Sequence, residues 1–167
     1  MDYVRRLHQS HRIEVNGEAA YATAARLTKE PERRAKWEAL RQLETQMKTQ
    51  LAVALQREGT TARERRLDVW LGQAGGGIAA MLPWRMVVWA LAKITAHTTR
   101  FWERLEREQV GRNPTLFAAL TAHERAQQEF ARRELSGEVK TSLEFVSALL
   151  SRGPWAATVG HEGGNLT

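Results

Sequence analysis

A carboxylate on an otherwise apolar helical face is the first feature of this chain that bears on chemistry. Read at 3.6 residues per turn, Glu44 lies on one stripe with Trp37, Leu40, Met47, Leu51 and Ala54. An ionised carboxylate in an apolar interior costs several kcal/mol unless a cation, a hydrogen-bond donor or a proton compensates it. Glu44 therefore predicts either a solvated face or a partner on another helix.

Two further stretches place acids on faces that we expect to be buried. The inner stripe of residues 3–25 contains Glu14 and Glu18, and the inner stripe of residues 116–131 contains Glu124. Three predicted helices thus each bring a carboxylate toward the interior, as in metal sites built between the helices of a bundle. The alternative for Glu14 and Glu18 is a position at the edge of the interior, where they meet arginines in water.

The elements that must position these acids are all helical. Apolar periodicity and helix-end signals predict helices over residues 3–27, 31–58, 83–110, 114–135 and 139–150. Thr28 is the expected N-cap of the second helix and Asn113 that of the fourth, each followed by a proline suited to the first turn. Gly59 is expected to end the second helix.

The long connection between the second and third helices is expected to carry a small helix over residues 62–71. Gly72 and the run of residues 75–77 should interrupt it, and no phosphate-binding glycine pattern is present. The connections are thus short, long and short, which predicts an all-α, ferritin-like four-helix bundle with a long crossover between helices 2 and 3 and a short fifth C-terminal helix. We expect one domain over residues 1–152 and a flexible tail over residues 153–167.

Amino-acid composition limits the kinds of partner that this protein can have, but it does not identify one. The 167 residues carry a net charge of +6 and contain no cysteine, which excludes disulfides and thiolate chemistry. The basic residues are spread over all the helices, which favours a solvated arginine-rich surface over a nucleic-acid site. Residues 78–94 are apolar but too short for a transmembrane segment, so we expect a central core helix in preference to a surface that lies on a bilayer.

Three short motifs resemble those of a known family. The stretch Glu14-Val15-Asn16-Gly17-Glu18 resembles the first-helix motif of demethoxyubiquinone hydroxylases. Residues 43–47 and 123–127 lie where ferritin-like di-iron proteins carry Glu-x-x-His. The resemblance implies iron, or another divalent metal, held between the helices, with Glu18, Glu44 and Glu124 at the positions of ligands.

The departures from that family concern the ligands themselves. Met47 and Gln127 stand where the resemblance implies histidines, and Thr98 stands where it implies a glutamate. Methionine and a neutral amide are poor ligands for ferric iron, so the site is expected to be degenerate. Substitute or accessory ligands would come from Glu14 and three histidines near the predicted inner faces, which are His11, His97 and His123.

Three functions follow from this reading. The first is a binding or structural protein of di-iron ancestry, which has lost its metal site or holds a single altered metal. The second is an active metal-dependent oxidoreductase or hydroxylase with unusual ligands. The third is a peripheral membrane module that binds anionic lipid or a quinone-like ligand, and a homodimer is compatible with all three. The N-terminus shows no secretory signal, so a cytoplasmic or membrane-peripheral location is expected.

Overall fold

The computed structural model describes residues 3–108 and 113–152, and within them every regular element is a helix. The elements are α1 (Tyr3–Leu27), α2 (Pro31–Arg57), α3 (Arg66–Met81), α4 (Trp84–Glu108), α5 (Pro114–Ser136), the 3-10 helix η1 (Val139–Thr141) and α6 (Glu144–Ser151). The all-α prediction is therefore confirmed. The predicted tail of residues 153–167 lies outside the described residues.

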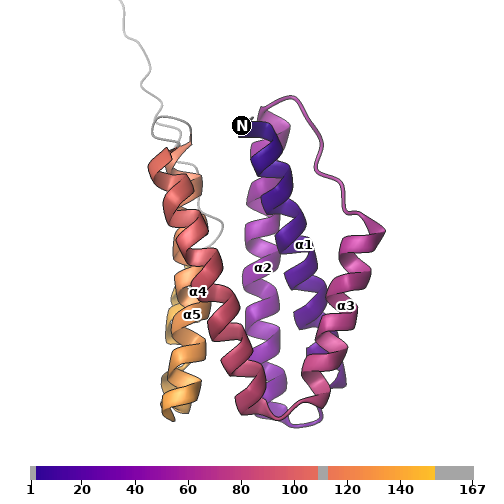
Figure 1. Ribbon diagram of the computed structural model, residues 1–167, viewed down its shortest axis with the longest axis vertical. Coiled ribbons are helices and arrows are strands. Elements are labelled where there is room, and N and C mark those ends of the chain that lie inside the picture. The colour runs from indigo at the N-terminus through magenta and orange to yellow at the C-terminus, as the bar shows by residue number, and fades with distance from the viewer. Residues whose placement is uncertain (1–2, 109–112, 153–167) are drawn as a thin grey trace, which may run out of the picture.

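Four long helices enclose one interior that has two apolar layers. Helix α1 packs along α2, and α4 packs along α5, so that two helical hairpins lie against each other (Figure 1). The upper layer includes Leu7, Leu51, Trp102 and Leu120, one from each long helix. The lower layer again draws on all four of these helices, and Val146 and Leu149 of α6 close it. Burial of apolar stripes from both hairpins holds the hairpins together.

Helix α3 is longer than the sequence predicted, and the glycines do not interrupt it. The helix runs through Gly72 and the following glycines to Met81, and it packs along α1 (Figure 1). A Cβ atom on Gly72 would lie 2.2 Å from the backbone oxygen of Asn16, and one on Gly76 would lie 2.0 Å from that of Ala20. The two glycines therefore permit a backbone contact with α1, whose small residues form the matching surface.

One predicted N-cap residue is replaced by another residue, and a second makes no capping hydrogen bond. The N-cap of α2 is Glu30, whose carboxylate accepts hydrogen bonds of 2.9 Å from the backbone N–H groups of Glu32 and Arg33. Thr28 instead donates its hydroxyl proton back to the carbonyl of Ala24. Asn113 stands at the N-cap of α5 with a left-handed φ of 47°, but its side chain makes no capping bond. Pro31 and Pro114 occupy the first turns, as the sequence predicted.

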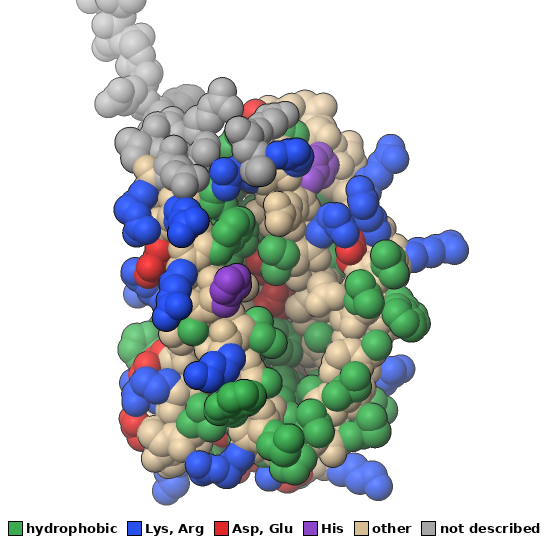
Figure 2. All heavy atoms as spheres, viewed as in Figure 1, with side chains coloured by type: hydrophobic (Ala, Val, Ile, Leu, Met, Phe, Trp, Pro, Cys, Tyr) green, Lys and Arg blue, Asp and Glu red, His purple; other side chains and the backbone are tan. Residues whose placement is uncertain are grey.

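The prediction of a core helix over residues 78–94 is wrong for most of that segment. Val87 and Val88 are buried, but Ile78, Met86 and Trp89 are each more than half exposed. These residues belong to an apolar α3–α4 face, visible as the green area at the lower right of Figure 2. We define this face by Leu67, Trp70, Leu71, Ile78, Met81, Leu82, Met86, Trp89 and Ile94. In the described part of the chain, no helix combines the length and hydropathy that a membrane crossing needs.

Candidate metal centre

A polar layer separates the two apolar layers halfway along the long helices. Glu14 of α1, Glu44 of α2 and both His123 and Glu124 of α5 lie between residues of the upper and lower layers, and all four are buried. The helical stripes that contain these residues are otherwise apolar, so packing of the neighbouring turns pulls the polar groups inside. Acids from three helices thus do converge, as the sequence predicted for Glu44 and Glu124.

Glu14, Glu44 and His123 form the centre of this layer. His123 Nε2 lies 3.4 Å from Glu14 Oε2 and 3.3 Å from Glu44 Oε1. One ligand atom from each of the three residues lies within 4.8 Å of the other two. Two ligands at about 2.1 Å from one ion stand roughly 3.0 to 3.4 Å apart in octahedral or tetrahedral geometry. The contacts of His123 with both carboxylates match that spacing.

Gln127 joins the centre to α1. Its amide nitrogen donates to Glu44 Oε1 at 2.5 Å and lies 2.8 Å from His123 Nε2. Its amide oxygen accepts a hydrogen bond of 2.5 Å from the Tyr21 hydroxyl. Rotation of the amide by 180° would turn the oxygen toward Glu44 and His123, while the Tyr21 hydroxyl would accept from the nitrogen. Gln127 can therefore donate to the carboxylate or offer a fourth, neutral ligand oxygen.

Glu124 lies in the same layer but already has two donors. Thr98 donates its hydroxyl proton to Glu124 Oε2 at 2.7 Å, and the Trp102 indole N–H donates to Glu124 Oε1 at 3.3 Å. Both donors come from α4, so they fix the orientation of the carboxylate within the layer. Thr98 thus has a role as a hydrogen-bond donor at the position where the family resemblance implied a glutamate ligand.

Burial and crowding of negative charge shift the proton equilibria of this layer. Burial, reinforced by Glu44 and Glu124, raises the pKa of Glu14 well above its usual value. Burial by itself would lower the pKa of His123, but the carboxylates of Glu44 and Glu124 outweigh it and raise that pKa. Burial raises the pKa of Glu124 against the opposing effects of His123 and Thr98. The layer therefore holds more negative charge than its single histidine can balance, and it attracts protons or a cation.

Three atoms at the centre lack a hydrogen-bond partner. Both carboxylate oxygens of Glu14 are buried without one, and so is His123 Nδ1. Buried polar groups are nearly always hydrogen-bonded, because the water lost on burial is otherwise not replaced. Glu14 is 1% exposed, so bulk water does not compensate it. The unmatched oxygens face the two residues that would complete a ligand set.

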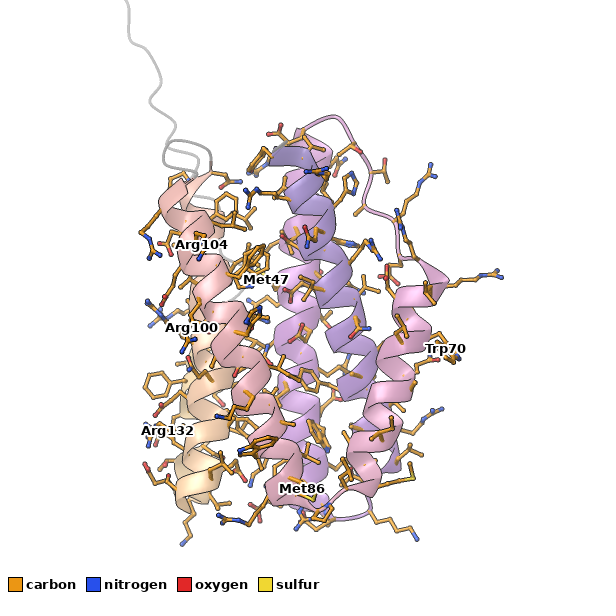
Figure 3. All side chains as sticks on the ribbon, in the orientation of Figure 1. Met47, Trp70, Met86, Arg100, Arg104 and Arg132 are labelled. Atoms are coloured by element: carbon orange, nitrogen blue, oxygen red, sulfur yellow. The ribbon has the colours of Figure 1, made fainter. Side chains whose placement is uncertain are left out.

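The remaining predicted ligands do not reach the centre. Glu18 contacts Lys48, with which it pairs, and accepts a 2.5 Å hydrogen bond from Thr45, which places it on the outer side of α1 and α2. Glu14, one turn earlier, holds the inner position. His97 is exposed, and Met47 is packed in the upper apolar layer between the helices (Figure 3). His11 is buried, but it does not belong to the group of ligand atoms around His123.

Gly17 and Tyr21 have roles that sequence reasoning did not assign. A Cβ atom on Gly17 would lie 2.5 Å from Glu44 Oε2, so the absence of a side chain makes room for the Glu44 carboxylate against α1. Tyr21 stands one turn after Gly17 on the predicted inner stripe. Its phenol group at an inner position was the signal that could have marked it as a donor to the site.

An apolar pocket of about 400 Å³ leads from the surface to this layer. Its inner end includes Glu44, Glu124 and Gln127, and small residues of α1 and α3 form one wall. Ile78, Leu82 and Ile94 line it and also belong to the exposed α3–α4 face, so the pocket opens there. A mostly apolar pocket with a few polar groups at one end is the usual form of a small-molecule site.

The donor set fits one metal ion and does not fit two. Two irons need about six protein ligands from facing helices, whereas Met47 is packed in the core, Thr98 is a hydrogen-bond donor and Glu18 points away. One ion needs only Glu14, Glu44 and His123, with Gln127 or water beside them. Comparison with protein-family models, curated proteins and solved structures finds no match to this chain.

Proposed function

We propose that this protein binds one divalent transition-metal ion between its helices, through Glu14, Glu44 and His123. The observation that carries the proposal is the Glu14 carboxylate, which is buried, accepts no hydrogen bond at either oxygen and lies 3.4 Å from His123 Nε2. A cation held by Glu14, Glu44 and His123 would compensate both carboxylates at once. Carboxylate oxygen and imidazole nitrogen suit Mn²⁺, Fe²⁺, Co²⁺ or Zn²⁺, and they do not suit soft Cu⁺.

A ferritin-like, di-iron ancestry for this site is part of the same proposal. The order of two hairpins joined by a long crossover and the convergence of acids from three helices support it. Under this proposal the chain keeps the inner acid of α2 and that of α5. It has replaced the remaining ligands with groups that donate hydrogen bonds or fill the core. The result is a mononuclear site with an acid from α1 that lies one turn earlier than the family motif implies.

The pocket favours a second candidate function, a metal-dependent oxidoreductase that acts on an apolar molecule. The pocket ends at Glu44 and Gln127, so a molecule within it would reach the proposed ion. A bound redox-active metal would supply electron transfer and dioxygen activation. The chain's own groups would orient the molecule and hold protons, because Tyr21, Glu44 and Gln127 line the pocket and the Tyr21 hydroxyl donates to Gln127. Oxygen consumption that requires both iron and an apolar co-substrate would support this function.

The metal proposal is tested with Co²⁺, whose visible spectrum reports nitrogen and oxygen ligands. Titration of metal-free protein should show one equivalent bound per chain, with a tetrahedral or five-coordinate spectrum. Glu44→Gln and His123→Asn should each weaken binding by roughly 100-fold or more, because each removes one of three ligands. Glu18→Gln is the matched control, since this acid lies one turn away on α1 and pairs with Lys48. It should bind Co²⁺ like the wild type.

Three results would overturn the proposal. The first is binding of two tight equivalents per chain, which would indicate a dinuclear site. The second is loss of binding in Glu18→Gln with retention in Glu44→Gln, which would place the ion outside the polar layer. Circular dichroism of each variant checks that the helices are intact. Wild-type protein that binds no Co²⁺, Zn²⁺ or Fe²⁺ at micromolar concentration would equally contradict it.

A further inference from the structure

The α3–α4 face collects most of the exposed apolar side chains of the described chain. Nine of the fourteen large hydrophobic residues that are exposed there belong to this face. They include both strongly exposed tryptophans, Trp70 and Trp89, and Met81 is 79% exposed. Figure 2 shows most of this area in one view, and Figure 3 shows Trp70 directed away from the other helices. Exposed apolar side chains gathered on one side of a molecule mark a surface that is covered in use.

The exposed charges within residues 66–102, which contain the whole face, have one sign. From Arg66 to Trp102 the only acid is Asp68, which is buried and forms a bidentate pair with Arg12 at 2.8 Å. The basic residues of the same stretch are all exposed, and they are Arg66, Arg85, Lys93 and Arg100. Lys93 Nζ lies 5.9 Å from the centre of the Trp89 ring, so a cation stands directly beside the apolar surface. Within residues 66–102, the exposed surface is therefore apolar and its charges are all cationic.

From this combination we propose that the α3–α4 face docks on an anionic membrane surface. Tryptophan, methionine and aliphatic side chains would enter the interfacial region, while Arg85 and Lys93 would contact lipid phosphates. A second copy of the chain seated on the same face by two-fold symmetry would bring like charges together, with no exposed acid between Arg66 and Trp102 to oppose them. An anionic bilayer satisfies both the apolar and the cationic part of the surface.

The mouth of the pocket lies on the face that would dock on the membrane. Because Ile78, Leu82 and Ile94 belong both to the face and to the pocket lining, the pocket mouth would lie against the lipid. An apolar molecule could then pass between bilayer and pocket without crossing water. Docking does not depend on the metal, so a failed metal titration would leave it standing, and a failed docking test would leave the metal site standing.

The test is flotation of the full chain with vesicles. Wild-type protein should float with vesicles of phosphatidylglycerol and phosphatidylcholine at low salt and much less in 0.5 M salt or with phosphatidylcholine alone. Trp70→Ser/Trp89→Ser should lower the partition coefficient by at least tenfold. The matched control is Val53→Ser/Phe145→Ser, which removes two exposed apolar side chains outside the face and should float like the wild type.

Charge reversal tests the electrostatic part. Lys93→Glu should lower binding to the anionic vesicles by roughly fivefold or more, whereas Lys140→Glu, an exposed lysine of η1, should change it much less. Equal loss in face and control variants would overturn the proposal, because it would show attraction by net charge alone. Absence of flotation at low salt would also overturn it. Sedimentation analysis that showed a dimer broken by Trp70→Ser/Trp89→Ser would assign the face to a second copy instead.

Discussion

The polar layer and a second buried acidic site, at Glu134, differ in how their charge is compensated. In the lower apolar layer, Glu134 has a 1% exposed side chain, and Lys36 Nζ lies 2.8 Å from its Oε1. This contact is a buried ion pair. The Trp84 indole N–H donates to Glu134 Oε2 at 2.7 Å, and Lys36 also reaches Glu32. Each charge at this site has an opposite partner.

The polar layer has no such balance. It contains three buried carboxylates and one histidine, and the Glu14 oxygens lack donors. The pKa of Lys36 is raised because its bonds to Glu134 and Glu32 outweigh the opposing effect of burial, so the lysine stays charged. The pKa of Glu14 is raised chiefly by burial itself, which favours the neutral form. One site is thus a completed ion pair, and the other is a site that needs a proton or a metal.

The largest expected effect comes from breaking the completed pair. Lys36→Met should lower the free energy of unfolding by about 3 to 5 kcal/mol, because it leaves the Glu134 carboxylate buried without a counter-charge. Urea denaturation followed by circular dichroism measures it. The double variant Lys36→Met/Glu134→Leu removes both charges and should recover most of the loss. A single variant within 1 kcal/mol of wild type would contradict the account of this site.

Glu14→Gln should raise the free energy of unfolding of the metal-free protein, in contrast to Lys36→Met. The glutamine keeps the shape, removes one buried negative charge and donates to Glu44, so unfolding at pH 8 should require about 1 to 3 kcal/mol more. The wild-type carboxyl has a folded pKa above its unfolded value, so its proton stabilises the folded state most below about pH 4.5, and this contribution falls as pH rises. The advantage of the variant should therefore grow from pH 5 to pH 8 with EDTA present. A constant difference would rule out the raised pKa.

Gly17→Ala should lower the affinity for the metal ion more than it lowers the stability of the protein. The new methyl group would meet the movable end of Glu44, 2.5 Å from Oε2, so the carboxylate must shift. We expect a stability change within about 1 kcal/mol of wild type and a Co²⁺ affinity lower by roughly tenfold. Gly75→Ala, on the pocket wall with nothing near its Cβ position, is the control and should bind normally. If Gly17→Ala bound Co²⁺ as tightly as the wild type, Glu44 would not be a ligand of the ion.

The smallest effect is expected at a carboxylate on the surface. Glu129 is paired with Arg132 and Arg133 at 2.8 Å, and these bonds lower its pKa to about 2. Glu129→Gln should cost less than about 1 kcal/mol at pH 7, since solvent screens exposed pairs. The paired carboxylate contributes above its unfolded pKa and loses that contribution as pH falls through about 2. Unfolding curves at pH 7, 4 and 2 should therefore converge for variant and wild type.

The sequence by itself determined the helices and most of their bounds. Long runs with 3.6-residue apolar periodicity and prolines in first turns predicted α1, α2 and α5 closely, because these signals act within one or two turns of the chain. The stripe around Glu44 predicted either a solvated face or a partner on another helix, and the structure has the second, with Glu44 4% exposed.

Tertiary structure alone decided which polar groups meet. Glu14 and Glu18 are one turn apart and fit the same stripe, and only the placement of α2 and α5 beside α1 brings Glu18 to Lys48 and Glu14 to His123. Helix propensity alone marks the glycines of α3 as helix breakers, because it takes no account of their contact with the backbone of α1. The exposure of residues 78–94 was decided in the same way. Helix periodicity shows that a face is apolar, but the neighbours that cover it are fixed by the packing of the whole chain.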